Sequence, residues 1–402
     1  MRHRLQLNEI GAVLLLTAGA FLIRTYGISF PPNPYFDEEH YVPAALALLN
    51  QQQDPNWVHP PLAKWILAGA VGCLGNNPLG WRLPSVLIGT AMIPIQYTLG
   101  RKLLGQHRAA LFAAFLLSLD FLHIVQSRIA TLDIYLAAFL LTGFLALVTA
   151  LDREKGLTRS GLIFLSALLF GLALLTKGSA LFGLLGAGAI LLNSKKNRGE
   201  PASWAILLGA PLLLYILAYL CIPPHRGIHE VLSLHARILG FHARSAMEHP
   251  YTSHFWEWPF VLRPIWYFFS QPDSLHVKGI LAAANPVLWW AGFVCICYTV
   301  YNRNLRSSME GATILATYLF QLLPWGLFAR GGFFYYVLPA VPSLYLAIAL
   351  TMTHQQPRLR RGIEVGIVVV AIAGFLLFFP LLSGISVSAI LYNFIIFTPR
   401  WI

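Results

Sequence analysis

The sequence is short of charged residues. Of its 402 residues only 11% are charged, whereas 57% are hydrophobic. A soluble domain is about one quarter charged, so this chain lacks the polar side chains that would cover a water-soluble globule of its size. The shortage excludes a cytosolic enzyme and a disordered protein, and it indicates that much of the surface faces lipid.

Cysteine is scarce as well, which excludes a disulfide-stapled scaffold. The four cysteines, Cys73, Cys221, Cys295 and Cys297, lie within apolar stretches. Free cysteines in such surroundings usually behave as small hydrophobic residues rather than as metal ligands. The phosphate-binding pattern GxxxxGK[ST] is also absent, so the sequence gives no indication of a nucleotide-driven activity.

What the chain has instead is long apolar runs. A membrane-spanning helix needs about 20 mostly apolar residues, and about eleven runs approach that length. These runs are residues 8–28, 82–101, 109–125, 130–150, 160–175, 177–193, 202–221, 280–300, 310–328, 332–352 and 363–381. The shorter run 61–75 predicts an interfacial or re-entrant helix. No small-residue cleavage site follows the first run, so we expect it to remain as a span.

Basic residues predict the orientation of these spans. The net charge of +12 is concentrated in short loops such as 193–200 and 354–362, and such loops stay in the cytoplasm. We therefore expect an integral membrane protein with a cytoplasmic N-terminus and no nucleic-acid partner. The expected parts are an N-terminal membrane module (1–221), an external loop (222–279) and a C-terminal membrane region (280–402). Because function concentrates on loops held by a rigid scaffold, we expect the chemistry in the external loops 29–81 and 222–279.

The first external loop carries the densest set of candidate residues. Asp37, Glu38 and Glu39 precede an apolar helix whose first turn suits Pro43. Ionised acids are favoured at a helix N-terminus, and an ionised acid can act as a general base. The alternative is a solvated acidic cap. Two prolines then hold His59 extended, and Arg82 follows at the mouth of the second span.

The order of these motifs resembles the protein O-mannosyltransferase family. The matching segments are DEEH, HPPLAK, WRLPSVLIGT, QSRIATLD, LLTKGSALF, SHFWEWP with LRPIWY, and RGGFFYYVLP, over roughly residues 20–350. The resemblance implies an all-α polytopic membrane protein of the GT-C glycosyltransferase fold that takes sugar from a polyprenyl-phosphate donor. The loop 222–279 is too short for the large insert of eukaryotic members, so the chain looks like a prokaryotic form in the plasma membrane.

The resemblance also implies roles for individual residues. Asp37 is the expected base, and Glu38 is expected to orient acceptor or sugar hydroxyls. His59 is expected in the wall of the acceptor groove, and Asp133 either in the site or in a structural bond. The expected ligands of the lipid phosphate are Arg82, Arg128, Lys177, Arg263 and Arg330. Arg82 has the alternative of pairing with Asp37 or Glu38, and every basic residue at a span end has the alternative of reaching the membrane interface.

No cofactor is expected. His225 and His229 have the i, i+4 spacing of a metal pair, but Pro223, Pro224 and Gly227 argue against a regular helix there. The expected partners are the bilayer, a polyprenyl-phosphate-linked sugar, for which mannose is expected, and a secreted or membrane protein whose Ser or Thr receives it.

Three other functions stay open. They are transfer to a lipid or cell-envelope glycan, transport of a polyprenyl-linked sugar, and a subunit without catalysis. A transporter tends to have repeated halves with a site at mid-membrane. Here the polar residues crowd one face, and Asp37 is present, which favours the transferase.

Overall fold

The computed structural model describes residues 2–194, 200–221, 227–244, 249–328, 331–396 and 398–401. The α-helices are α1 (Arg2–Thr25), α2 (Glu38–Leu49), α3 (Leu62–Leu74), α4 (Pro78–Leu104), α5 (His107–Ser118), α6 (Phe121–Gln126), α7 (Asp133–Leu151), α8 (Leu157–Leu174), α9 (Ala180–Asn193), α10 (Pro201–Cys221), α11 (Ile228–Arg244), α12 (Pro286–Tyr301), α13 (Arg303–Ser307), α14 (Met309–Leu322), α15 (Val341–Thr353), α16 (Pro357–Ser383) and α17 (Ala389–Ile395). Short 3-10 helices are η1 (Phe255–Phe260), η2 (Leu323–Leu327), η3 (Phe334–Ala340) and η4 (Pro399–Trp401).

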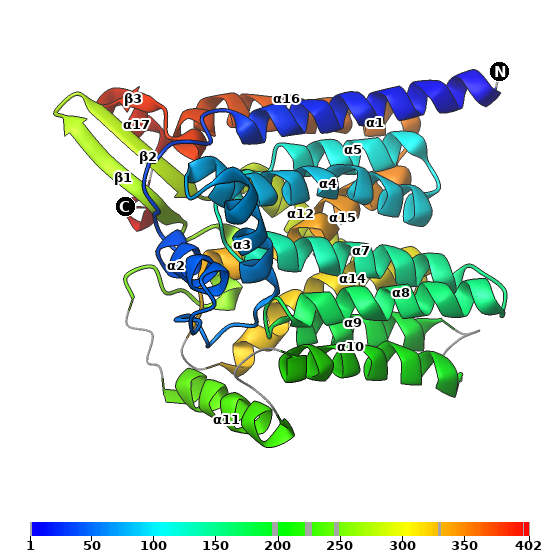
Figure 1. Cartoon of the computed structure of the whole chain (residues 1–402). Helices are drawn as coiled ribbons and strands as arrows, with labels where there is room; N and C mark the ends of the chain where they lie inside the picture. The colour runs from blue at the N-terminus through cyan, green and yellow to red at the C-terminus, as the bar shows by residue number, and fades with distance from the viewer. Residues whose placement is uncertain are drawn as a thin grey trace.

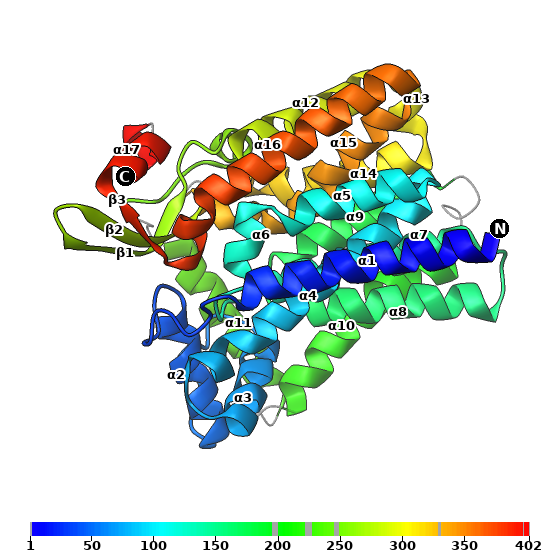
Figure 2. The same ribbon diagram turned by 90° about the horizontal axis from the view of Figure 1, so that it is seen from above.

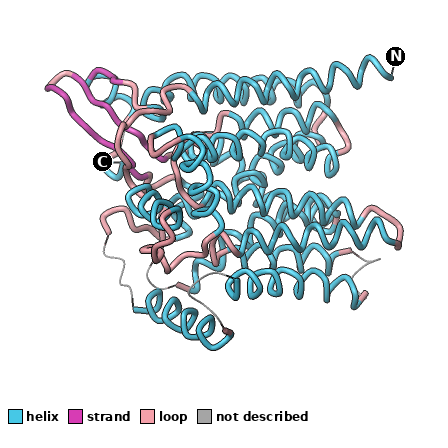
Figure 3. The backbone as a smooth tube through the Cα atoms, in the orientation of Figure 1, coloured by secondary structure: helices cyan, strands magenta, loops and turns pink. Residues whose placement is uncertain are grey.

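The long helices form a bundle with two different ends. In Figure 1 the N-terminus lies at one end, while α2, α3 and the strands lie at the other, which we call the sheet end. Most of the loops that are not simple turns also gather at the sheet end (Figure 3). Seen from above, α1 and α16 lie on the same outer face of the bundle (Figure 2).

The helices confirm an integral membrane protein. Within the described residues, 7 helical stretches are long and apolar enough to cross a membrane, and α5, α9 and α12 are shorter apolar helices. Together with α14, this set is compatible with the expected number of spans. The run 61–75 forms the separate short helix α3, at the sheet end beside α2.

Two expected spans have different boundaries in the structure. The run 109–125 is divided because Asp120 accepts a hydrogen bond from the amide of His123 and so begins the new helix α6. The run 280–300 begins as a strand, and α12 starts only at Pro286, where Asn285 is the N-cap.

A small antiparallel sheet is the feature that the all-α prediction lacks. Strands β1 (Ile265–Asp273), β2 (His276–Ala282) and β3 (Ser386–Ser388) are arranged in the order β1-β2-β3. The segment 222–279, expected as a loop, therefore contains α11, η1 and a hairpin. The aromatic and β-branched residues of β1 favour a strand, and a register shift between Trp266 and Phe268 marks a bulge.

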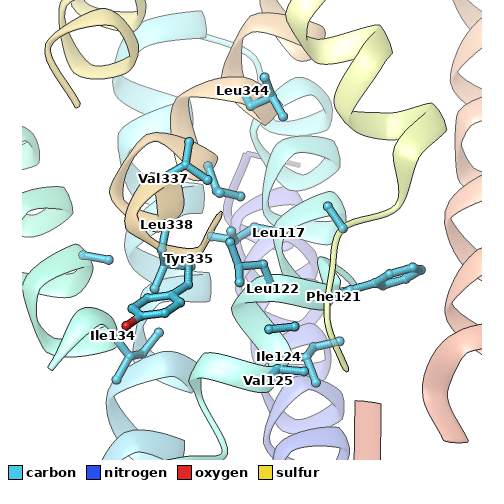
Figure 4. Close-up of a cluster of buried hydrophobic side chains, with 14 of the residues drawn as sticks. Leu117, Phe121, Leu122, Ile124, Val125, Ile134, Tyr335, Val337, Leu338 and Leu344 are labelled. Atoms are coloured by element: carbon cyan, nitrogen blue, oxygen red, sulfur yellow. The ribbon is translucent and has the colours of Figure 1, made fainter. Parts of the chain in front are cut away.

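The buried core extends to the sheet end and fixes η3. Side chains from α5, α6, α7, η3 and α15 meet in the cluster of Figure 4, where Tyr335 lies beside Ile134 and close to Leu338. Phe334, Val337 and Leu338 are almost fully buried. Because this packing holds η3 rigidly, the position of the Tyr335 hydroxyl is also fixed.

Candidate active site

Asp37 lies where the loop after α1 turns into α2. Phe36, the residue before it, has a φ of 52°, a left-handed conformation that is uncommon for a bulky residue and that clusters at functional sites. The ring of Phe36 stacks on Tyr267 of β1 with centroids 3.9 Å apart. This contact between the α1–α2 loop and the sheet holds the backbone immediately before Asp37.

Three polar groups surround the Asp37 carboxylate. The hydroxyl of Tyr335 donates to its Oδ2 at 3.2 Å, and both Asp133 and Lys177 lie near enough to act on its charge. Burial is the main cause that raises the pKa of Asp37 to about 6, and the neighbouring Asp133 raises it further, while Lys177 and Tyr335 oppose the shift. Asp37 itself is only partly buried, so it stays accessible to a substrate.

Lys177 and Asp133 form an ion pair beside Asp37. The Nζ of Lys177 donates to Asp133 Oδ1 at 2.8 Å, and it lies 4.3 Å from the centre of the Tyr336 ring. The other Asp133 oxygen, Oδ2, is buried without a hydrogen-bond partner. We call Asp37, Asp133, Lys177, Tyr335 and Tyr336 the Asp37 site. It contains two carboxylates and one cation.

Glu38 and Arg82 form a buried ion pair with each other. Arg82 donates from Nε and NH2 to the two Glu38 oxygens at 2.9 and 2.8 Å, and both side chains are fully buried. Arg82 also donates to the carbonyls of Ile28, Pro31 and Asn33, which uses all of its donors. The amide of Ala130 donates to Glu38. The structure therefore has the Arg82–Glu38 pair that the sequence left open as an alternative, and the substrate contacts expected for the two residues stay predictions.

The other predicted phosphate ligands differ in how many of their donor groups already have a partner in the protein. Arg128 donates from NH1 to the carbonyls of Ile23 and Arg24 at 3.1 and 2.8 Å, where its charge suits the C-terminal end of α1. Arg263 precedes β1, is partly buried, and its Nε has no hydrogen-bond partner. Neither arginine has an ion pair with an acid among the described residues. Arg330 lies outside the described residues.

His59 lies in the loop before α3, beside Tyr41 of α2. Its ring centroid is 6.1 Å from that of Tyr41, and its carbonyl accepts a hydrogen bond from Lys64 at 2.8 Å. Lys64 also binds Asp54, so this lysine holds the loop together. Among the residues that the structure describes, no three His, Cys, Asp or Glu side chains are grouped as a metal site; His225 falls outside them.

The sequence motifs contained several residues of the site without indicating their roles. Tyr335, Tyr336 and Tyr267 stand in matched motifs. Only the fold shows that Tyr335 bonds Asp37, that Tyr336 lies beside Lys177 and that Tyr267 lies beside Tyr335. Phe36 carries no local signal at all, because its importance comes from its backbone conformation and from a ring on a distant strand.

The fold is similar to those of known membrane glycosyltransferases. The structure of the Saccharomyces cerevisiae protein O-mannosyltransferase Pmt1-Pmt2 complex bound to the sugar donor matches with a TM-score of 0.86 and 13% identity, over 98% of this chain and 93% of the other. ArnT from Cupriavidus metallidurans, bound to undecaprenyl phosphate, matches with a TM-score of 0.59 and 19% identity, over 90% and 64%. The protein thus has the GT-C glycosyltransferase fold.

Sequence comparison gives the family. A model described as dolichyl-phosphate-mannose-protein mannosyltransferase matches residues 58–222, and one for the C-terminal four-span region of protein O-mannosyltransferase matches residues 228–401. The polyprenol-phosphate-mannose–protein mannosyltransferase of Mycobacterium tuberculosis is 24% identical over 97% of this chain and 91% of its own length. That of Corynebacterium glutamicum is 26% identical over 92% and 88%. The chain belongs to the protein O-mannosyltransferase family.

Proposed function

We propose that the protein transfers mannose from a polyprenyl-phosphate donor to a Ser or Thr hydroxyl of a protein. The observation that carries the proposal is a partly accessible carboxylate, Asp37, held by Tyr335 beside the Lys177–Asp133 pair. The names of the relatives, each a polyprenol-phosphate-mannose–protein mannosyltransferase, support the choice of donor and acceptor.

Asp37 is the proposed general base. The acceptor hydroxyl gives its proton to Asp37, and the hydroxyl oxygen bonds to the anomeric carbon of the sugar. The bond between that carbon and the phosphate oxygen breaks, and its electron pair stays with the phosphate. The leaving polyprenyl phosphate needs no acid, but it gains from positive charge. With a pKa of about 6, Asp37 is ionised at neutral pH and yet more basic than an ordinary aspartate.

Arg263 is the phosphate ligand that the contacts favour. Arg82 is used completely by Glu38 and by backbone carbonyls, and Lys177 is neutralised by Asp133. The Arg263 guanidinium is partly buried and has an unsatisfied N–H, which a phosphate oxygen would satisfy through a charge-assisted bond. Lys177 then acts mainly by keeping Asp37 ionised.

We place the sheet end on the external, periplasmic side of a prokaryotic plasma membrane. The opposite end carries basic residues such as Arg101, Lys102 and Arg159 close to helix ends, as expected for the cytoplasmic side. The Asp37 site then faces secreted acceptors.

One assay tests the function. Purified protein is mixed with polyprenyl-phosphate-mannose and a Ser/Thr peptide, and the mass of the peptide is measured by mass spectrometry. We expect the mass of one hexose to be added at a Ser or Thr. Transfer only to a lipid acceptor offered in parallel would contradict the proposal and assign the chain to lipid glycosylation.

A further inference from the structure

Strand β1 is an outer strand of the sheet with one open edge. It pairs on one side with β2, and no backbone hydrogen bond joins its other side to another described segment. Phe269 and Gln271, near its middle, are exposed, and the strand lies along the outer border of the molecule (Figures 1 and 3). Natural proteins usually cover or shorten such an edge, because it is a template for another chain.

This strand begins at the wall of the Asp37 site. The bulge between Trp266 and Phe268 turns Tyr267 toward the first external loop, where it stacks on Phe36. Gln126 donates to the Tyr267 hydroxyl at 2.6 Å and fixes it. From Ser270 back to Tyr267 the strand rises about 10 Å, so the open edge and Asp37 lie within a few residues of extended chain.

The face of β1 that carries Trp266 and Phe269 packs against the C-terminal segment. The rings of Trp266 and Phe269 each lie 6.0 Å from the ring of Tyr392 on α17, and the Trp266 indole donates to the carbonyl of Trp401. The backbone of Trp266 also lies beside the Tyr251 hydroxyl. The available edge therefore starts beyond Trp266, on a sheet that is rigid enough to bind a partner without large ordering costs.

We propose that β1 binds the acceptor protein by strand addition. An extended acceptor segment pairs its backbone with the open edge over Phe268–Gln271, and the chain continues past Tyr267 so that a Ser or Thr reaches Asp37. Pairing through the main chain tolerates many acceptor sequences. Low sequence specificity suits an enzyme that modifies a Ser or Thr hydroxyl rather than a fixed sequence motif. The inference rests on the proposed function and names the form in which its substrate binds.

Acceptor peptides with single N-methylated amides test the proposal on the unchanged enzyme. Because neighbouring amides of a strand point to opposite sides, methylation should raise the acceptor KM three- to tenfold at alternate positions on one side of the modified residue, the loss expected for one hydrogen bond. The amides between them should give an unchanged KM. A flat profile, with the parent peptide still mannosylated, would overturn strand addition and leave the proposed function standing. Absence of transfer to any peptide would instead contradict the function itself.

Cross-linking gives a second, independent readout with a matched control. Ser270 on β1 and Ser386 on β3 are both register partners of Lys278, on opposite edges of the same sheet. In a background without the four native cysteines, Ser270→Cys should form a disulfide with a peptide that carries a cysteine near its acceptor residue, and Ser386→Cys should not. Equal cross-linking of both would overturn the proposal. So would a disulfide between Ser270→Cys chains that added peptide does not suppress, because that edge would then pair with a second copy.

Discussion

At the scale of single residues, the site depends on how two carboxylates share one cation. Lys177 donates a hydrogen bond to Asp133. Burial and Asp133 raise the pKa of Asp37, Lys177 lowers it, and the net pKa is about 6. A base is useful when it is ionised at the working pH but still basic, and this balance gives Asp37 both properties.

The rate should therefore depend on pH with a definite sign. The active form of Asp37 has lost its proton, so kcat/KM should rise as pH increases through about 6. At pH 5 only about one tenth of the sites should be ionised, and at pH 7 about nine tenths. Initial rates of mannosyl transfer from pH 4.5 to 8 measure this curve. A rate independent of pH between 5 and 7 would exclude Asp37 as the titrating group.

Lys177→Ala should move that curve toward higher pH. Without the cation, the two carboxylates repel each other and the pKa of Asp37 rises. We expect a large loss of kcat/KM at pH 6.5 that is partly recovered at pH 8, whereas Lys177→Arg, which keeps the charge, should retain the original midpoint. Equal losses at both pH values would mean that Lys177 binds the donor rather than adjusting Asp37.

At the scale of secondary-structure elements, the Glu38–Arg82 pair organises the sheet end. Arg82 is the fifth residue of α4, which begins at Pro78 with Asn77 as its N-cap. From there it holds three carbonyls of the loop 28–33 and the first residue of α2. The pair thus fixes the segment that leads to Asp37.

Breaking this pair should be costly. Removing one partner of a buried ion pair leaves an uncompensated charge and typically costs about 3–5 kcal/mol. We expect Glu38→Ala to lower the thermal unfolding midpoint in detergent by several degrees or to prevent stable expression. Lys102→Ala, which breaks a solvent-accessible pair with Asp152, should cost less than about 1 kcal/mol. Similar midpoints for the two variants would show that the Glu38–Arg82 pair contributes no more than a surface contact.

The elements also show what the sequence could and could not predict. The apolar runs and the acids around the start of α2 were recognisable because their signals are local. The pairing of Lys177 with Asp133, 44 residues apart, was not, since nothing local selects one acid among several. The strand β1 was missed because its aromatic residues are equally compatible with a membrane-interface segment. For the same reason the sequence left Arg82 between donor binding and a pair with Asp37 or Glu38, because the acid that it contacts, Glu38, is 44 residues away.

At the scale of the whole molecule, orientation decides which compartment supplies the acceptor. Cysteines at Gln52 and Glu154 report on the two ends of the bundle, and both positions are exposed. In a background without native cysteines, Gln52→Cys should react with a membrane-impermeant maleimide in intact cells. Glu154→Cys should react only after the membrane is opened. The reverse pattern would place the Asp37 site in the cytoplasm.

The activity of the whole molecule is assigned to one carboxylate, and its removal is the most direct test. Asp37→Asn keeps the shape of the side chain but cannot accept the acceptor's proton. General-base catalysis contributes about 10²–10⁴-fold, so with donor and peptide saturating we predict a loss of kcat in that range. Glu39→Gln, the exposed neighbour two residues away, should change kcat less than about threefold, because a solvated surface charge contributes little. Turnover of Asp37→Asn near that of the unmodified enzyme would contradict the assignment, and equal losses in the two variants would show that only the charge of the loop matters.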